Sequence, residues 1–327
     1  MAGVEVVVTG AGTALPLAGS PDELLPGRPT REPVDPATAL TGRGHRYKDR
    51  ATKLALIAAR AAMAEAGLLR DGALTVPGEA VGVVVSSNFG NMDTIGEVAR
   101  TIADRGYAAA SPMALPGTAS NVIASWLAIG YGLRGANLTL SNGDTSGLDA
   151  VHWGRFLIAA GRVASVVVVG VEPDTPQARE LRGDRPPTLD GAAALVLESR
   201  AHATARGSRP LATVGPYARA ATHDAAVKSV RAAEPATVGL WCLPGGPAVE
   251  RGGLDAVAAD LPGAVQHDLD AVHGAGAGAL GVLQCVAGVV WLRAGHGGAV
   301  LATACAGSTG GPDTAAALLL IGVGGEG

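Results

Sequence analysis

Several short runs of this chain are continuously apolar and do not alternate between apolar and polar positions. The clearest are rich in valine and lie at Val81–Ser86 and Ser165–Val171. Such a run predicts a strand buried on both faces, because a half-exposed strand carries a polar residue at every second position. Strands of this kind are typical of an α/β fold in which helices cover the sheet on both sides.

Predicted helices alternate with these strands. Asn121–Ile129 is apolar nearly all round and should therefore be a buried helix. The same order of strands and helices returns more weakly later in the chain, so we predict two duplicated halves, residues 1–200 and 210–327, linked by His202–Arg209. The other expected strands are Val4–Thr9, Asn137–Leu140, Ala192–Glu198, Leu211–Val214, Val238–Cys242, Val300–Ala304 and Ala315–Ile321, and the other expected helices are Ala51–Gly67, Met92–Asp104, Ser146–Ala160, Gly252–Ala259 and Ala277–Arg293.

The composition excludes several classes of function. Hydrophobic residues make up 48% of the chain and charged residues 17%, and the net charge of -4 comes without a basic stripe, which argues against nucleic-acid binding. No apolar run approaches the roughly 18 residues that span a bilayer, so we expect no membrane association. The three cysteines lack metal-ligand spacing and Met1–Thr9 is a strand pattern rather than a signal peptide, which predicts a metal-free cytoplasmic protein.

The most informative run is Asn137–Arg155, NLTLSNGDTSGLDAVHWGR. A short strand meets a tight turn and enters a helix at once, which is the geometry of a nucleophile elbow. The free N–H groups and the dipole at the start of such a helix can stabilise an anion. This run is therefore the candidate site.

At this run the sequence resembles the β-ketoacyl synthases of the thiolase-fold superfamily. The resemblance extends to VVVTGAG at Val6–Gly12, to the Ser111–Ser141 segment and to GRVASVVVVGVEP at Gly161–Pro173. It implies a thiolase-like α/β fold, with two duplicated halves in a layered α-β-α-β-α arrangement.

In an active ketosynthase the elbow carries a Cys nucleophile, and two His residues support decarboxylation of malonyl groups. By this resemblance Asp144 stands at the Cys position, Pro244 at the first His position and Val272 at the second, although a shift of one residue would place His273 there. The late Gly-Phe-Gly-Gly loop matches Ser308–Gly311, without its Phe. We therefore predict no catalytic residues at these positions.

The profile resembles the chain length factors of type II polyketide synthases. The resemblance implies a non-catalytic subunit that forms a heterodimer with an active ketosynthase and shapes the tunnel that sets polyketide chain length. An acyl carrier protein would supply its own phosphopantetheine arm, and the chain itself would bind no cofactor. The unusual Asp144 and the short stretch between Glu198 and Val238 favour a reduced or polyene product over an aromatic one.

Tunnel and interface residues follow from the same resemblance. The strand before the elbow would pair across the dimer axis, because it would otherwise be an exposed edge. Trp126 is a further possible tunnel residue, with ordinary core as the alternative. The predicted tunnel and interface residues are Met113, Leu115, Thr118, Val122, Asn137, Leu138, Thr139 and Leu140.

Two other functions remain open: a stand-alone acyltransferase or malonyl decarboxylase that uses Asp144 and His273, and a degenerate homodimeric scaffold. Asp144 itself is interpreted mainly as a helix N-cap. A dinucleotide site at Gly10–Gly12 is disfavoured, because Leu15 replaces the third glycine of the motif. Residues interpreted as structural or incidental are Cys305, which imitates an elbow, the buried Cys242 and Cys285, the packing or surface residue His152, and the solvated His45.

Overall fold

The computed structural model describes residues 3–40, 42–183, 186–245, 251–305 and 314–323. Within these residues ten strands join into one sheet, and a separate hairpin pairs β2 (Leu69–Arg70) with β3 (Ala73–Leu74). The ten strands are β1 (Val6–Ala14), β4 (Val81–Ser86), β5 (Asn137–Leu140), β6 (Ser165–Glu172), β7 (Gly191–Ser199), β8 (Ala212–Ala220), β9 (Val238–Cys242), β10 (Val265–His267), β11 (Ala299–Cys305) and β12 (Ala315–Ile321).

The strand order repeats itself. The first five strands lie in the order β5-β4-β6-β7-β1, and the last five lie in the corresponding order β10-β9-β11-β12-β8. The two sets meet where β1 pairs antiparallel with β8, at Val7 opposite Thr213 and Val8 opposite Ala212. Helices cover both faces of β6, so the strand is fully buried, and this is why its sequence is a continuous apolar run. The predicted α/β fold with duplicated halves is confirmed.

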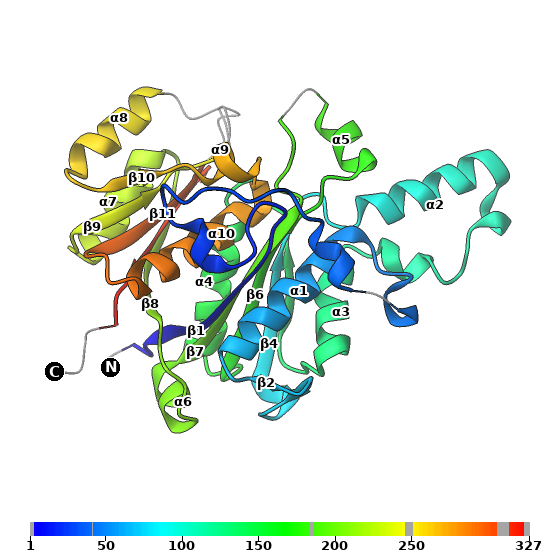
Figure 1. Cartoon of the computed structure of the whole chain (residues 1–327), viewed down its shortest axis with the longest axis horizontal. Coiled ribbons are helices and arrows are strands. Elements are labelled where there is room, and N and C mark those ends of the chain that lie inside the picture. Colours follow the sequence, from blue (N-terminus) through cyan, green and yellow to red (C-terminus); the bar gives the residue numbers. More distant parts are fainter. Residues whose placement is uncertain (1–2, 41, 184–185, 246–250, 306–313, 324–327) are drawn as a thin grey trace.

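The helices form three layers around the two sets of strands (Figure 1). α1 (Arg50–Glu65) and α3 (Val122–Tyr131) cover the outer face of the first set. α7 (His223–Ala233), with α8 (Arg251–Asp260) beside it, covers the second. α4 (Ser146–Ala159) and α10 (Ala277–Arg293) lie between them and contact strands of both sets. These helices and the two sets of strands together form the predicted layered α-β-α-β-α arrangement.

Two glycines let the central helices α4 and α10 touch backbone to backbone. A Cβ added to Gly147 would lie 2.7 Å from the amide nitrogen of Gly281, and a Cβ on Gly281 would lie 2.7 Å from the carbonyl carbon of Gly147. Real side chains do not tolerate such distances, so glycine is required on both helices. This crossing, at Gly147 and Gly281, brings the N-terminal ends of both central helices together.

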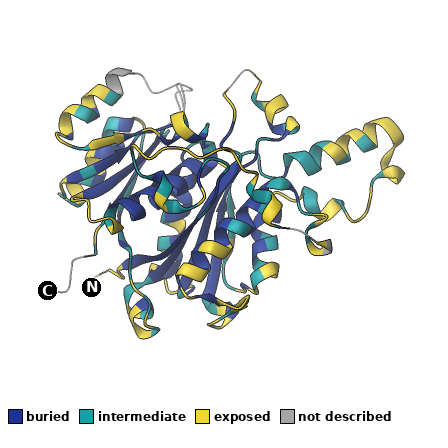
Figure 2. Ribbon diagram, in the orientation of Figure 1, coloured by how far each residue is buried: buried dark blue, intermediate teal, exposed yellow. Residues whose placement is uncertain are grey.

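One helix lies outside the three layers. α2 (Met92–Arg105) projects from the body (Figure 1), and none of its residues is buried. The stretch that follows α2 is also largely exposed (Figure 2), with Tyr107 at 85% and Met113 at 65% exposure. We call residues 92–121 the α2 arm. Among the described residues, none of the helices combines the length and the hydropathy that a membrane span requires.

The structure corrects several expectations about secondary structure. α3 is buried along one face only, through Val122, Ile123, Ala124 and Leu127, whereas Ile129 is 71% exposed. The sequence interpretation also missed α7 and the short β10. Further short helices that it missed are α5 (Pro176–Arg182), α6 (Arg200–Ala205), which covers part of the predicted link, and α9 (Leu269–His273).

Candidate functional site

The predicted elbow is present where β5 turns into α4. Gly143 adopts φ 89°, a conformation that favours glycine and makes the tight turn possible. The Asn142 amide donates to the Ser146 hydroxyl at 2.8 Å, and that hydroxyl donates to the Gly143 carbonyl at 2.7 Å. From the neighbouring loop, Asn88 Oδ1 accepts a bond from the Gly143 amide at 3.2 Å. The turn is therefore held from both sides.

Asp144 lies in this turn, half-buried, but it is not the N-cap of the helix. Thr145 occupies that position, and no side-chain capping bond is present there among the described residues. The cap interpretation was wrong by one residue. Burial raises the pKa of the Cys305 thiol, and the negative charge of the Asp144 carboxylate raises it further. The Asp144 carboxylate therefore lies near Cys305. Cys305, expected to be incidental, therefore belongs to the surroundings of the elbow.

A buried carboxylate, Asp149, ties the elbow to the second half of the molecule. It accepts bonds from Asn142 Nδ2 and from Thr145 Oγ1, the latter at 3.1 Å. From β8 the Tyr217 hydroxyl donates to Asp149, and Arg219 Nη1 lies 3.4 Å from its Oδ2. The sequence did not predict this network. Asp149 has the position of an ordinary acidic residue in the first turn of a helix, and its partners on β8 lie far along the chain.

A second buried carboxylate lies behind the elbow at the end of β6. Glu172 Oε1 accepts bonds from the backbone amides of Asn88 at 2.7 Å and Gly278 at 3.1 Å, and Oε2 accepts from that of Phe89 at 3.0 Å. Burial raises the pKa of Glu172 to about 7, against the opposing effect of these amides. Glu172 thus fixes the 87–89 loop, and with it Asn88, against the start of α10.

The two His positions differ in burial. Pro244 is buried just after β9 and has no acid–base group. Val272 is 40% exposed, whereas the neighbouring His273 is 9% exposed and its Nδ1 has no hydrogen-bond partner among the described residues. Burial lowers the pKa of His273 to about 4, so it is neutral at pH 7. This favours His273, rather than Val272, as the inward-facing residue at the second position.

The remaining expectations have mixed outcomes. Burial raises the pKa of Cys242 to about 12 and that of Cys285 as well, in agreement with inert packing. His152 stacks on Tyr217 with ring centroids 4.3 Å apart, which is a packing role, whereas His45 is half-buried rather than solvated. Ser308–Gly311 lies outside the described residues. Among the described residues no group of His, Cys, Asp or Glu side chains could hold a metal ion.

The predicted tunnel residues are spread along the α2 arm and the start of α3. Met113 and Leu115 are exposed, at 65% and 48%, and Thr118 is half-buried. Val122 is buried in the core beneath α3. Half-buried Trp126 carries the Lys48 ammonium 4.1 Å from its ring centroid. Met113 and Leu115 can therefore line an enclosed tunnel only if another molecule covers them.

β5 is confirmed as an edge strand. Among the described strands it ends the sheet and pairs with β4 alone, in parallel. Asn137 is exposed, and Leu138, Thr139 and Leu140 are half-buried. α3 and α4 flank β5, and three large apolar side chains on these helices are at least 41% exposed: Ile129, Trp153 and Phe156.

Sequence comparisons support the fold. Residues 32–181 match the family model described as "Beta-ketoacyl synthase, N-terminal domain". The 3-oxoacyl-[acyl-carrier-protein] synthase 2 of Vibrio harveyi is 31% identical over 153 residues, which cover 39% of this chain and 37% of that protein. The synthase 2 of Vibrio cholerae is 31% identical over 158 residues, covering 41% and 38%. These matches thus span less than two fifths of each relative.

Solved structures match over nearly the whole chain. The ishigamide ketosynthase/chain length factor superposes with a TM-score of 0.79 at 21% identity, covering 98% of this chain and 100% of that one. A type II polyketide synthase acyl-carrier protein in complex with its ketosynthase bound to the hexaketide gives 0.75 at 16% identity, with the same coverage. At these identities the likeness shows the fold. Residues 32–181 are therefore similar to the β-ketoacyl synthase N-terminal domain, and the chain as a whole has the thiolase-like fold seen in the ketosynthase structures.

Proposed function

We propose that this chain is the non-catalytic subunit of a ketosynthase heterodimer, with the role of a chain length factor. The observation that carries the proposal is the elbow, whose turn is complete but presents Asp144 where a condensing enzyme needs a thiolate. An acyl group on a carboxylate would be a mixed anhydride, which water readily hydrolyses. The nearby Cys305 does not replace the nucleophile, because its raised pKa keeps it a neutral thiol.

The exposed edge at β5 supports a partner subunit. An unpaired strand edge flanked by Ile129, Trp153 and Phe156 is an unfavourable surface for a lone soluble chain. We expect β5 to pair antiparallel with its counterpart in an active ketosynthase. The buried area should be that of an obligate interface, above roughly 2,000 Å².

Light scattering after coexpression with a ketosynthase tests the assembly. We expect a one-to-one complex, and no β-ketoacyl product from the purified chain alone when it is given acyl- and malonyl-carrier protein. A stable monomer that ignores the ketosynthase, or condensation by the single chain, would contradict the proposal. A homodimer that excludes the ketosynthase would instead identify the scaffold function.

The segment Ser111–Val122, most of which belongs to the α2 arm, is the proposed ruler. Met113 and Leu115 are exposed and Thr118 is half-buried, so a partner seated on the arm would enclose them beside the growing acyl chain. The carrier protein would deliver each unit through its phosphopantetheine arm. A chain one unit too long would then meet these side chains at the end of its tunnel.

Substitutions in the arm should change product length. Each extra buried CH₂ favours extension by about 0.8 kcal/mol, and a blocking side chain costs about 1–3 kcal/mol, or roughly five- to a hundredfold in product ratio. We expect Met113→Ala and Leu115→Ala to lengthen the products and Thr118→Trp to shorten them, as measured by mass spectrometry of carrier-bound intermediates. An unchanged length distribution in all three variants, with intact heterodimers, would place the ruler elsewhere.

The burial of His273 supports a second candidate function, a malonyl decarboxylase. His273 is buried and neutral at pH 7, so its imidazole could hydrogen-bond a malonyl thioester and support decarboxylation. Release of labelled CO₂ from malonyl-carrier protein by the purified chain tests this. Activity that falls in His273→Gln but persists in Val272→Ala would support a decarboxylase, and absence of CO₂ release would exclude it.

A further inference from the structure

The internal duplication provides a comparison within the molecule, and in the second half the connection between α7 and β9 borders a pocket. By strand order α7, β9 and α8 correspond to α1, β4 and α3. In the first half, residues 66–80 connect α1 to β4 and include the β2–β3 hairpin, whose Leu68 and Leu69 are buried and whose Leu74 packs on the core. In the second half only residues 234–237 make the corresponding connection.

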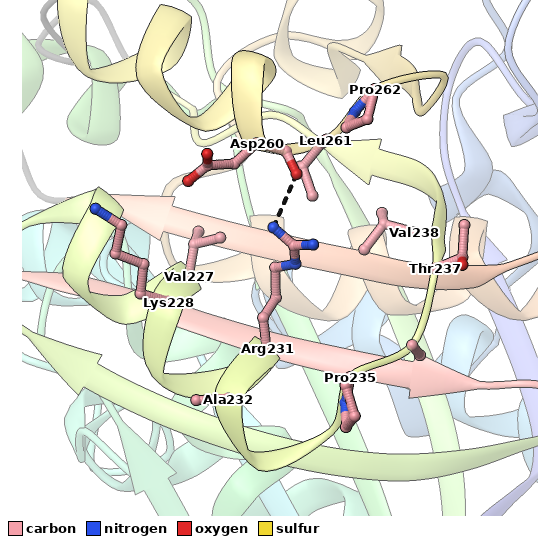
Figure 3. A pocket seen from close by; sticks show the side chains of 11 residues that line it. Val227, Lys228, Arg231, Ala232, Pro235, Thr237, Val238, Asp260, Leu261 and Pro262 are labelled. Carbon is pink, nitrogen blue, oxygen red and sulfur yellow. Dashed lines mark hydrogen bonds between the residues drawn. The ribbon is translucent and has the colours of Figure 1, made fainter.

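A hollow of about 480 Å³ lies beside this short connection. This is within the range of small-ligand pockets, roughly 300–1,000 Å³. Its walls come from the end of α7, the start of β9 and the turn after α8, and most of them are apolar (Figure 3). The apolar wall residues are Val227, Ala232, Pro235, Ala236, Val238, Leu261 and Pro262.

A single cation, Arg231, is available inside this pocket. Its side chain rises from α7 between the walls (Figure 3), and Nη1 donates to the backbone carbonyl of Asp260 at 2.8 Å. That bond holds the guanidinium in place, yet no carboxylate pairs with it among the described residues. Lys228 lines the same pocket, but its ammonium is engaged by Asp224 at 2.9 Å. One fixed guanidinium, whose remaining N–H groups have no hydrogen-bond partner among the described residues, therefore faces a mainly apolar hollow that also has Thr237 and Asp260 in its lining.

We propose that this pocket binds a small organic carboxylate that carries a short apolar chain. The apolar walls take the chain, and the free N–H groups of Arg231 donate to the carboxylate, a charge-assisted contact that guanidinium geometry favours. One available cation matches a monoanion better than a dianionic phosphate ester. The site is separate from the first His position, since the five-residue strand β9, roughly 16 Å long, lies between Val238 in the pocket and Pro244.

Calorimetric titration of the full chain with octanoate and with 1-octanol tests the proposal. We expect octanoate to bind, and Arg231→Gln to weaken octanoate roughly tenfold or more while leaving 1-octanol unchanged. Octanoate that fails to bind at millimolar concentration, or binds the variant equally well, overturns the proposal.

A pair of adjacent alanines provides the matched control. Ala232 lines the pocket and Ala233 follows it on the same helix outside the lining, and both are exposed, so either should accept a larger side chain without unfolding. We expect Ala232→Trp to abolish binding of both probes and Ala233→Trp to leave it unchanged. Equal binding by the two variants would place the ligand elsewhere. Heterodimer formation should be unaffected in both, so failure here is distinguishable from failure of the proposed assembly.

Discussion

The two halves of the molecule share a strand order but end in edges of different character. The first half ends at β5, beside which Ile129, Trp153 and Phe156 are exposed. The second half ends at the three-residue β10, where His267 Nε2 bonds to the carbonyl of Leu24, a residue from the segment after β1. The two duplicated halves have therefore diverged at their edges. One edge remains available for a partner, and the chain itself contacts the other.

The largest effect on stability should come from the buried ion pair beside the link between the halves. Glu198 is fully buried on β7 and pairs with Arg206 just after α6, which also donates to the Ala66 carbonyl at 2.6 Å. Arg206→Ala would remove the guanidinium partner of the buried Glu198 carboxylate and lower the free energy of unfolding by about 3–5 kcal/mol. Urea unfolding measures it.

A surface pair gives the control for this prediction. Arg134 and Glu79 are 70% and 64% exposed, so Arg134→Ala should change the free energy of unfolding by at most about 1 kcal/mol. Equal losses in the two arginine variants would show that the halves do not depend on the Glu198–Arg206 pair.

The two edges can be compared directly with one charge each. Ile129 is 71% exposed beside β5, and Val265 is 40% exposed on β10. We expect Ile129→Glu to weaken the ketosynthase complex by roughly 2 kcal/mol or more, about thirtyfold, because it buries a charge in the interface. Val265→Glu should leave affinity unchanged. Surface plasmon resonance against the ketosynthase decides it, and equal affinities would refute the assignment of the interface to β5.

The crossing of α4 and α10 should be sensitive to a single methyl group. Gly281→Ala places a Cβ against the backbone of Gly147 and Leu148, which cannot move without separating the helices, so we expect a loss of about 1–3 kcal/mol. Gly130→Ala, on α3, meets only Leu56 Cδ2 at 3.5 Å and should stabilise the helix by about 0.5–1 kcal/mol. Thermal unfolding should therefore shift in opposite directions.

The smallest expected effect is on pH dependence, and its sign differs between the halves. In the second half, burial lowers the pKa of His223 to about 4, so its contribution to stability is present above the unfolded pKa of about 6.5 and is lost as pH falls toward 4. In the first half, the pKa of Glu172 is raised to about 7, so its contribution is present below about pH 4.5 and is lost as pH rises through 7.

Replacement of His223 separates the two contributions. Between pH 7 and pH 5 His223→Phe should lose about 1–2 kcal/mol less stability than the wild type, as measured by urea unfolding at both pH values. Parallel curves for the two proteins would mean that His223 does not titrate differently in the folded state.

Much of the fold was predictable because its signals are local. The valine runs gave β4 with its observed bounds, and the uninterrupted apolar stretch gave α10. β10 was missed because three residues are too few to show a period. α7 was missed although Thr222 caps it and Ala226, Val227 and Val230 form its buried face.

The candidate site was less predictable because its contacts are not local. The elbow followed from a strand–turn–helix run of adjacent residues, but the Asp149–Tyr217 contact joins positions 68 residues apart. The difference in burial between His273 and Val272 depends on how α9 packs, and the neighbouring residues in the sequence do not predict that packing. Cys305 lies near Asp144 only because the second half folds back onto the first.

The contact between Gly147 and Gly281 has a consequence for how this sequence can diverge. Each glycine fills the space that a side chain on the other helix would need, so neither position can accept a larger residue while the other stays in place. The two positions are thus constrained as a pair across the duplication. Mutational drift can change the two sheet edges independently, but it must leave this crossing as it is.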